Sequence, residues 1–95
     1  MGCEYNINFK MDDTQEVSEL LKALPYFLEV KSFQNRNQYI FRTSGNSGAL
    51  PSGLAEIDAN GIYFCDYGEG RDILRELIFR VGLSYKKLEV IDHSE

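Results

Sequence analysis

Apolar and polar side chains alternate at the start of the chain. Between residues 3 and 10, the side chains of Tyr5, Ile7 and Phe9 are separated by single polar residues. A period of two residues is typical of a strand that buries one of its faces. The pattern predicts a β-strand over residues 3–10.

In the next segment the apolar residues are spaced as in a helix. Asp13 stands three positions before Glu16, which is the spacing of a capping box, and Pro25 follows the last apolar position. The apolar positions recur at i, i+3, i+4 and i+7 and share one helical face: Val17, Leu20, Leu21 and Leu24. The segment is predicted to form an amphipathic helix that ends at Pro25 and packs on a sheet.

A first β-hairpin is expected from residues 26–33 and 38–43, which are rich in strand-forming side chains. A two-residue turn just before residue 38 would set Lys31 opposite Arg42, and like charges in directly opposed positions destabilise a pair of strands. A four-residue loop instead places Glu29 opposite Arg42. We therefore predict a hairpin with the longer loop.

A second hairpin is predicted around the Asn60-Gly61 dipeptide, which strongly favours a two-residue type I′ turn. With this turn, Ile57 lies opposite Phe64 on an apolar face that points into the core. The pairs on the other face are more polar: Asp58 with Tyr63 and Glu56 with Cys65.

The second helix is predicted to begin after Gly68 and Gly70 and to end just before Gly82. Its inward positions follow the helical spacing: Ile73, Leu74, Leu77, Ile78 and Val81. A last strand is expected over residues 85–91.

Two segments lack the apolar side chains that packing requires. Residues 44–53 (SGNSGALPSG) consist mainly of Gly and Ser, so we expect a flexible loop there. Residues 92–95 are polar and terminal, so we expect a frayed tail.

The predicted element order is β-α-β-β-β-β-α-β. In an α+β protein of this kind, helices gather on one face of an antiparallel sheet. We therefore predict a two-layer sandwich with a mainly antiparallel sheet and two helices on one face. The length of 95 residues is enough for a single α+β domain, residues 1–95, and too short for two.

The charge balance narrows the range of partners. The chain has 10 Lys and Arg against 15 Asp and Glu, a net charge of −5. Nucleic-acid binding requires a basic surface, so it is not expected.

Apolar runs are far shorter than the roughly 18 residues of a membrane span, and the start does not resemble a signal peptide. With only Cys3 and Cys65, and these far apart, we expect free thiols and a cytoplasmic protein.

Few residues are candidates for catalysis. The only imidazole belongs to His93 near the chain end, so a His-based triad is not expected. Cys65 would need a lowered pKa to act as a nucleophile, and the predicted neighbour Glu56 raises it. We therefore predict no catalytic residue, no metal site and no cofactor.

An acidic stretch is the strongest candidate for a binding surface. Residues 56–70 contain no Lys or Arg, and aromatic residues stand beside their acids. The predicted outer face of the second hairpin carries Tyr63, Cys65 and Tyr67, and that of the first carries Phe33 and Ile40. The residues predicted to bind a partner are Glu56, Asp58, Tyr63, Cys65, Asp66, Tyr67 and Glu69.

These features predict a non-enzymatic protein-interaction module, such as a small acidic inhibitor or an immunity-type protein, which binds a basic partner through its exposed sheet face. A homodimer is a second expected interaction, since an aromatic face or an open strand edge can pair with its own copy. The alternative is a small-molecule-binding regulatory domain with residues 44–53 as a lid. An enzyme acting through Cys65 or the acidic stretch ranks third.

Overall fold

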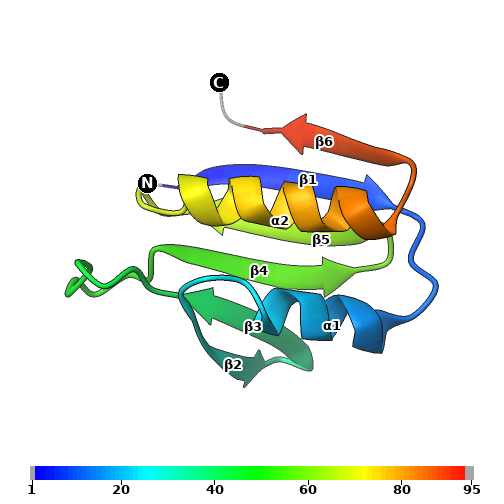
Figure 1. Cartoon of the computed structure of the whole chain (residues 1–95). Helices are drawn as coiled ribbons and strands as arrows, with labels where there is room; N and C mark the ends of the chain where they lie inside the picture. Colours follow the sequence, from blue (N-terminus) through cyan, green and yellow to red (C-terminus); the bar gives the residue numbers. More distant parts are fainter. Residues whose placement is uncertain (1, 94–95) are drawn as a thin grey trace.

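The structure is a computed structural model that describes residues 2–93 and consists of a sheet with two helices on one of its faces (Figure 1). In chain order the elements are β1 (Cys3–Phe9), α1 (Thr14–Lys22), β2 (Phe27–Phe33), β3 (Arg36–Phe41), β4 (Gly53–Asp58), β5 (Gly61–Asp66), α2 (Arg71–Ser84) and β6 (Leu88–Asp92). The strands lie in the order β2-β3-β4-β5-β1-β6, and every neighbouring pair is antiparallel. The predicted fold class and element order are confirmed.

The core lies between the sheet and the two helices. Central strands supply Ile7, Phe41, Ile62 and Phe64, none of which is exposed to solvent. The helices supply fully buried side chains from their inward faces: Val17 and Leu21 from α1, and Ile73, Leu77 and Val81 from α2. The period-two and helical patterns of the sequence therefore identified the core correctly.

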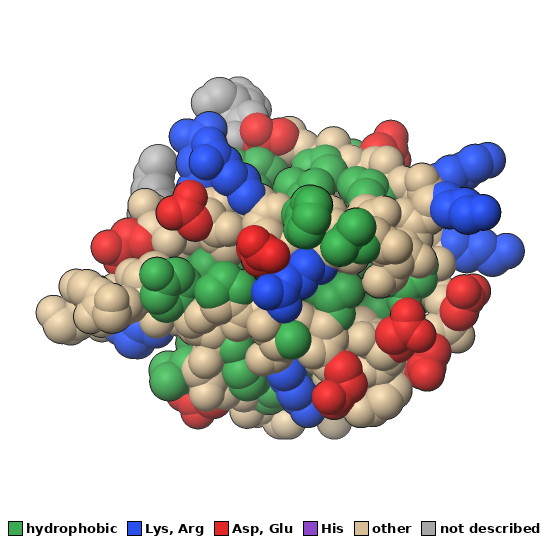
Figure 2. All heavy atoms as spheres, in the orientation of Figure 1, with side chains coloured by type: hydrophobic (Ala, Val, Ile, Leu, Met, Phe, Trp, Pro, Cys, Tyr) green, Lys and Arg blue, Asp and Glu red, His purple; other side chains and the backbone are tan. Residues whose placement is uncertain are grey.

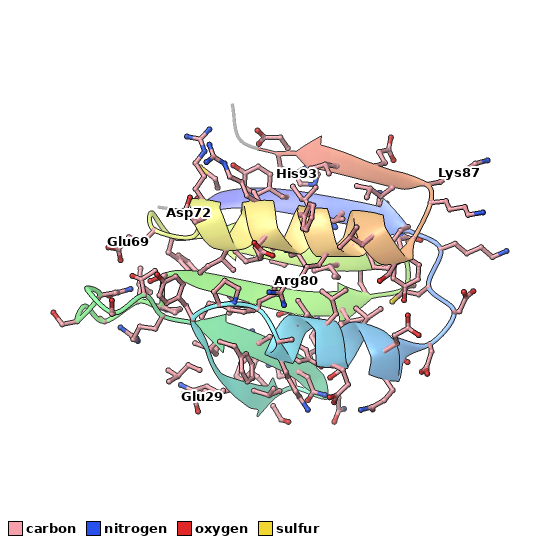
Figure 3. All side chains as sticks on the ribbon, viewed as in Figure 1. Glu29, Glu69, Asp72, Arg80, Lys87 and His93 are labelled. Atoms are coloured by element: carbon pink, nitrogen blue, oxygen red, sulfur yellow. The ribbon has the colours of Figure 1, made fainter. Side chains whose placement is uncertain are left out.

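The two helices begin and end close to the predicted positions. Asp13 caps α1, since its Oδ1 accepts a hydrogen bond from the backbone N–H of Gln15 at 2.9 Å. Helix α2 continues through Gly82 to Ser84, so the prediction that it ends before Gly82 is wrong. Arg80 joins the helices: its Nη1 donates to the carbonyl of Ala23 at 2.8 Å, and Figure 3 shows it between α2 and α1.

The turn of the first hairpin differs from the prediction. Strands β2 and β3 are joined by two residues, Gln34 and Asn35, with φ angles of 51° and 64°. Positive φ at both central positions is the requirement of a type I′ turn, which matches the twist of the strands. Lys31 lies opposite Gln38 and not Arg42, so the like charges that argued for a longer loop never meet.

The second hairpin also turns one residue earlier than predicted. Its turn is formed by Ala59 and Asn60, and Ile57 lies opposite Ile62 instead of Phe64. Asp58 stabilises this turn, because its Oδ1 accepts a hydrogen bond from Asn60 N at 2.8 Å. In the second hairpin, and in the first from Glu29 onward, the pairing changes by two residues, so the side chains stay on their predicted faces. A β-bulge between Phe27 and Glu29 breaks this rule, because it places Phe27 opposite Phe41 on the core side.

The segment predicted to be a flexible loop is anchored at its end. Ser52 is fully buried, and its Oγ accepts hydrogen bonds from Thr43 N and Asn46 Nδ2, both at 2.9 Å. Gly53 belongs to β4 and not to the loop. Flexibility of the remaining residues stays a prediction.

Strand β6 includes part of the predicted frayed tail. Asp92 is its last residue, and His93 N donates to the Glu4 carbonyl at 2.8 Å. The other two residues of that tail, Ser94 and Glu95, lie outside the described residues.

Candidate functional site

The sheet has one face that the helices do not cover, which we call the outer face. Directly opposed residues of antiparallel strands share a face. Ile7 and Ile62 oppose each other in the core, so their sequence neighbours Asn6 and Tyr63 point to the outer face. By the same alternation the outer face of the four strands β4, β5, β1 and β6 carries four acids: Glu4, Glu56, Asp58 and Glu89.

Tyr63 lies near the middle of this outer face and is partly buried. Its hydroxyl donates a hydrogen bond to Glu4 Oε1 at 3.0 Å, which links β5 to β1. Burial raises the pKa of Tyr63, and the hydrogen bond to the Glu4 carboxylate raises it further. Tyr67 is also partly buried, and burial raises its pKa too. Both tyrosines are therefore neutral hydrogen-bonding groups at physiological pH.

Cys65 lies between the two tyrosines and is only 6% exposed. The start of the chain runs close above it, since a Cβ at Gly2 would be 2.7 Å from Cys65 Sγ. Burial raises the pKa of this thiol, although hydrogen bonds with Tyr67 and Tyr63 oppose the shift. Because nucleophilic cysteines require a lowered pKa, the raised pKa of this buried thiol does not support a nucleophilic role. Its acidic cross-strand neighbour is Glu4 and not the predicted Glu56.

Glu56 is an acid of the outer face that contacts two side chains of β3. Its side chain is 13% exposed, and Oε1 lies 3.5 Å from Arg36 Nη2 on β3. Gln38 Nε2 also donates to Glu56 Oε2 at 3.1 Å. The base that pairs with Glu56 therefore comes from β3, outside the acidic stretch of residues 56–70.

Asp66 and Glu69 do not belong to the outer face. Asp66 points to the helix side, where its Oδ1 accepts hydrogen bonds from Gly68 N and Gly70 N, both at 2.8 Å. Glu69 Oε1 lies 3.5 Å from Ser52 Oγ, at the anchored end of the loop, and Figure 3 shows it at that end of the molecule. The seven predicted binding residues are thus divided between two surfaces.

Sequence reasoning missed two acids of the outer face, Glu4 and Glu89. Both are exposed and reach this face because β1 pairs with β5 and β6 pairs with β1. None of the strands β1, β4, β5 and β6, as the structure describes them, contains a Lys or an Arg. The helix side differs, since acidic, basic and apolar side chains are mixed there (Figure 2).

Two cavities on the surface do not involve the loop that was considered as a lid. One, of about 430 Å³, lies between the start of α1 and the turn of the first hairpin and is lined by Arg36, Tyr39 and Glu56, among others. The other, of about 520 Å³, lies beside Lys10 and Lys87. No residue of 44–53 lines either cavity, so the structure offers the lid hypothesis no support at these two places.

Comparisons with protein-family models, with curated proteins and with solved structures found no significant match. Among residues 2–93, His, Cys, Asp and Glu nowhere gather in a group of three that could hold a metal ion. Within the same residues, neither helix is long and apolar enough to cross a membrane. Both cysteines are free thiols.

The raised tyrosine pKa values predict a loss of stability at alkaline pH. The unfolded chain releases these protons near pH 10 and the folded chain only at higher pH. The contribution of these tyrosines to the free energy of unfolding should thus be constant below about pH 9 and fall as the pH rises above about 10. Tyr63→Phe should make the decline shallower in urea unfolding series between pH 8 and 12.

Glu4→Gln provides the matched comparison. It removes the carboxylate partner but leaves Tyr63 buried, and burial is the larger cause of the shift. The decline should therefore change less than with Tyr63→Phe. An identical alkaline decline in the wild type and in Tyr63→Phe would contradict the assignment.

Proposed function

We propose that this protein is a non-enzymatic protein-interaction module that binds a basic protein partner through its outer face. One observation carries the proposal: four neighbouring strands place acids and the partly buried Tyr63 on an uncovered surface, Tyr67 follows directly after β5, and these strands contain no base. An inhibitor or immunity-type protein of a cationic target is the functional class that fits this charge. A cytoplasmic location is part of the proposal, since such a compartment keeps both thiols reduced.

The tyrosines provide contact area at low entropic cost. Tyr63 is held by Glu4, and Tyr67 by its contact with Cys65, so neither ring needs to lose much freedom on binding. Tyrosine is enriched in protein interfaces because it combines a large apolar surface with a hydrogen-bonding group. These two side chains are therefore the proposed anchors.

The acids provide electrostatic attraction at a distance. Glu4 and Glu89 are exposed and come from different strands, so together with Asp58 they spread negative charge over the face. A surface of one sign attracts a partner of the opposite sign, which raises the association rate and changes the dissociation rate little. Glu56, already paired with Arg36, contributes less to this field.

The proposal predicts a slower association when the exposed acids are reversed. The wild type and Glu4→Lys/Glu89→Lys serve as baits in parallel pull-downs, and the protein retained by the wild type is identified by mass spectrometry. Its association rate with the double variant should be tenfold or more lower at low salt, because steering contributes about 10- to 1000-fold. Raising the ionic strength until the Debye length falls to about 8 Å should also lower the association rate of the wild type.

Glu19→Lys/Asp72→Lys is the matched control. It changes the net charge by the same amount, but both side chains are exposed on the helices. Its association rate should stay close to that of the wild type. A partner whose association is insensitive to salt and to the outer-face reversals, or that responds equally to the control, would overturn the proposal.

A further inference from the structure

Strand β2 forms an open edge of the sheet, and no other element lies beyond it in Figure 1. Helix α1 lies over β4 and leaves the end of the sheet uncovered. Leu28 and Val30 are consequently 53% and 36% exposed, although Val30 pairs with Tyr39 and shares its core-facing side. An edge that combines free backbone groups with exposed apolar side chains is a surface on which another strand can pair.

The first hairpin determines which backbone groups of β2 are free. In a hairpin with a two-residue turn, the residues that flank the turn form a hydrogen-bonded pair, here Phe33 with Arg36. Hydrogen bonding to the partner strand alternates along an antiparallel pair. Phe33 and Lys31 therefore direct their N–H and C=O groups to β3, whereas Ser32 and Val30 direct theirs to the open edge.

This alternation restricts how β2 can pair with a second copy of itself. Outward-directed residues must lie opposite outward-directed residues, so a two-fold axis near the middle of β2 can pass through Val30, which then faces its own copy, or through Glu29 or Lys31, which places Val30 opposite Leu28 or Ser32 of the other copy. An axis through Glu29 opposes the two Glu29 side chains, and one through Lys31 opposes the two Lys31 side chains. An axis through Val30 instead places Glu29 opposite Lys31 on both sides.

Among these three central registers, the charges on β2 favour the one at Val30. Opposite charges in directly opposed positions stabilise an antiparallel pair, and like charges destabilise it. Both Glu29 and Lys31 are exposed, and within one chain they lie 4.0 Å apart on the same face. The edge strand β6 offers no such match, since Leu88–Asp92 contains acids and no base.

We propose that the protein forms a homodimer in which two β2 strands pair antiparallel about a two-fold axis at Val30. The two sheets join into one continuous sheet, and the exposed Val30 side chains meet on the side that carries the helices. Two Glu29–Lys31 pairs form between the copies on the opposite side. This interface is distinct from the outer face of β4, β5, β1 and β6, which remains open for another partner.

Variants that exchange the charges of β2 test the register directly. Their dimer dissociation constants are measured by sedimentation equilibrium between about 10 and 300 μM. Glu29→Lys and Lys31→Glu each replace two opposite-charge pairs by like-charge pairs, so each should raise the dimer dissociation constant by roughly tenfold or more. An equimolar mixture of the two variants restores both pairs and should form a heterodimer. The double exchange Glu29→Lys/Lys31→Glu should restore the homodimer.

Two further variants complete the test. The outer-face variant Glu4→Lys/Glu89→Lys should dimerise like the wild type, because neither residue lies on β2. In a Cys3→Ser background, mild oxidation should cross-link Val30→Cys, since the two Cα atoms of a hydrogen-bonded pair lie about 5.5 Å apart. Ser32→Cys, displaced from the axis, should not cross-link.

Three results would overturn the proposal. If the wild type is monomeric at about 300 μM, β2 does not pair with a second copy of itself. A dimer unaffected by the single charge reversals would have its interface elsewhere. Loss of the dimer in both single variants without recovery on mixing would refute the register at Val30.

Discussion

Phe64→Ala should lower the free energy of unfolding by about 3–5 kcal/mol, the usual range for removing a buried aromatic ring. Phe64 on β5 has no exposed surface, and its ring centroid lies 6.3 Å from that of Phe41 on β3. Its position between the sheet and the helices leaves little room for the surroundings to collapse into the cavity. Urea unfolding followed by circular dichroism measures the effect.

Tyr63→Ala is the control on the neighbouring position. Tyr63 points to the outer face and is only partly buried, so its removal costs the hydrogen bond to Glu4 and a smaller apolar area. The loss should be clearly smaller than that of Phe64→Ala. Equal destabilisation by the two substitutions would contradict the assignment of the faces.

The faces of the strands could be predicted because they depend on a local pattern. Alternation in β1 and β5 placed Ile7, Ile62 and Phe64 in the core whatever their pairing partners were. Both hairpin registers were wrong by two residues, and a shift of two returns the side chains to the same face, except at the β-bulge between Phe27 and Glu29. Burial therefore followed from the sequence even where the pairing did not.

The turns could not be predicted because the position of a turn also depends on contacts with distant strands, which local composition does not contain. For the first hairpin, the predicted four-residue loop spans residues 34–37, whereas the observed turn consists of Gln34 and Asn35 alone, both with positive φ. For the second, Asn60-Gly61 has the composition of a type I′ turn. Gly61 instead lies in β5 and is required by its contact with β1, which no local pattern reveals.

The binding surface was predicted only in part because it depends on contacts between distant strands. Tyr63 and Glu56 were placed on the outer face by the alternation of one hairpin. Glu4 and Glu89 join them only through the pairing of β1 with β5 and β6, which involves residues about 60 to 80 positions apart. Arg36, which neutralises Glu56, likewise comes from a different hairpin.

Gly61→Ala should be among the most destabilising single substitutions in the chain. Gly61 has φ 146°, and a Cβ there would lie 2.1 Å from the carbonyl oxygen of Ile7, a backbone atom of the central strand β1. The strained φ costs about 1–3 kcal/mol. Since a backbone atom of a paired strand cannot move aside, the overlap adds about another 1–3 kcal/mol.

Gly68→Ala separates these two causes. Gly68 also has a positive φ, 128°, but a Cβ there would meet nothing within 4 Å. This variant should show the backbone strain alone, so its free energy of unfolding should exceed that of Gly61→Ala by about 1–3 kcal/mol in urea. Because the difference between the variants measures the close approach of β5 to β1, equal stabilities would mean that the two strands do not pair as described. The same pairing brings Glu4 to Tyr63, so such a result would also remove the basis for the outer-face site.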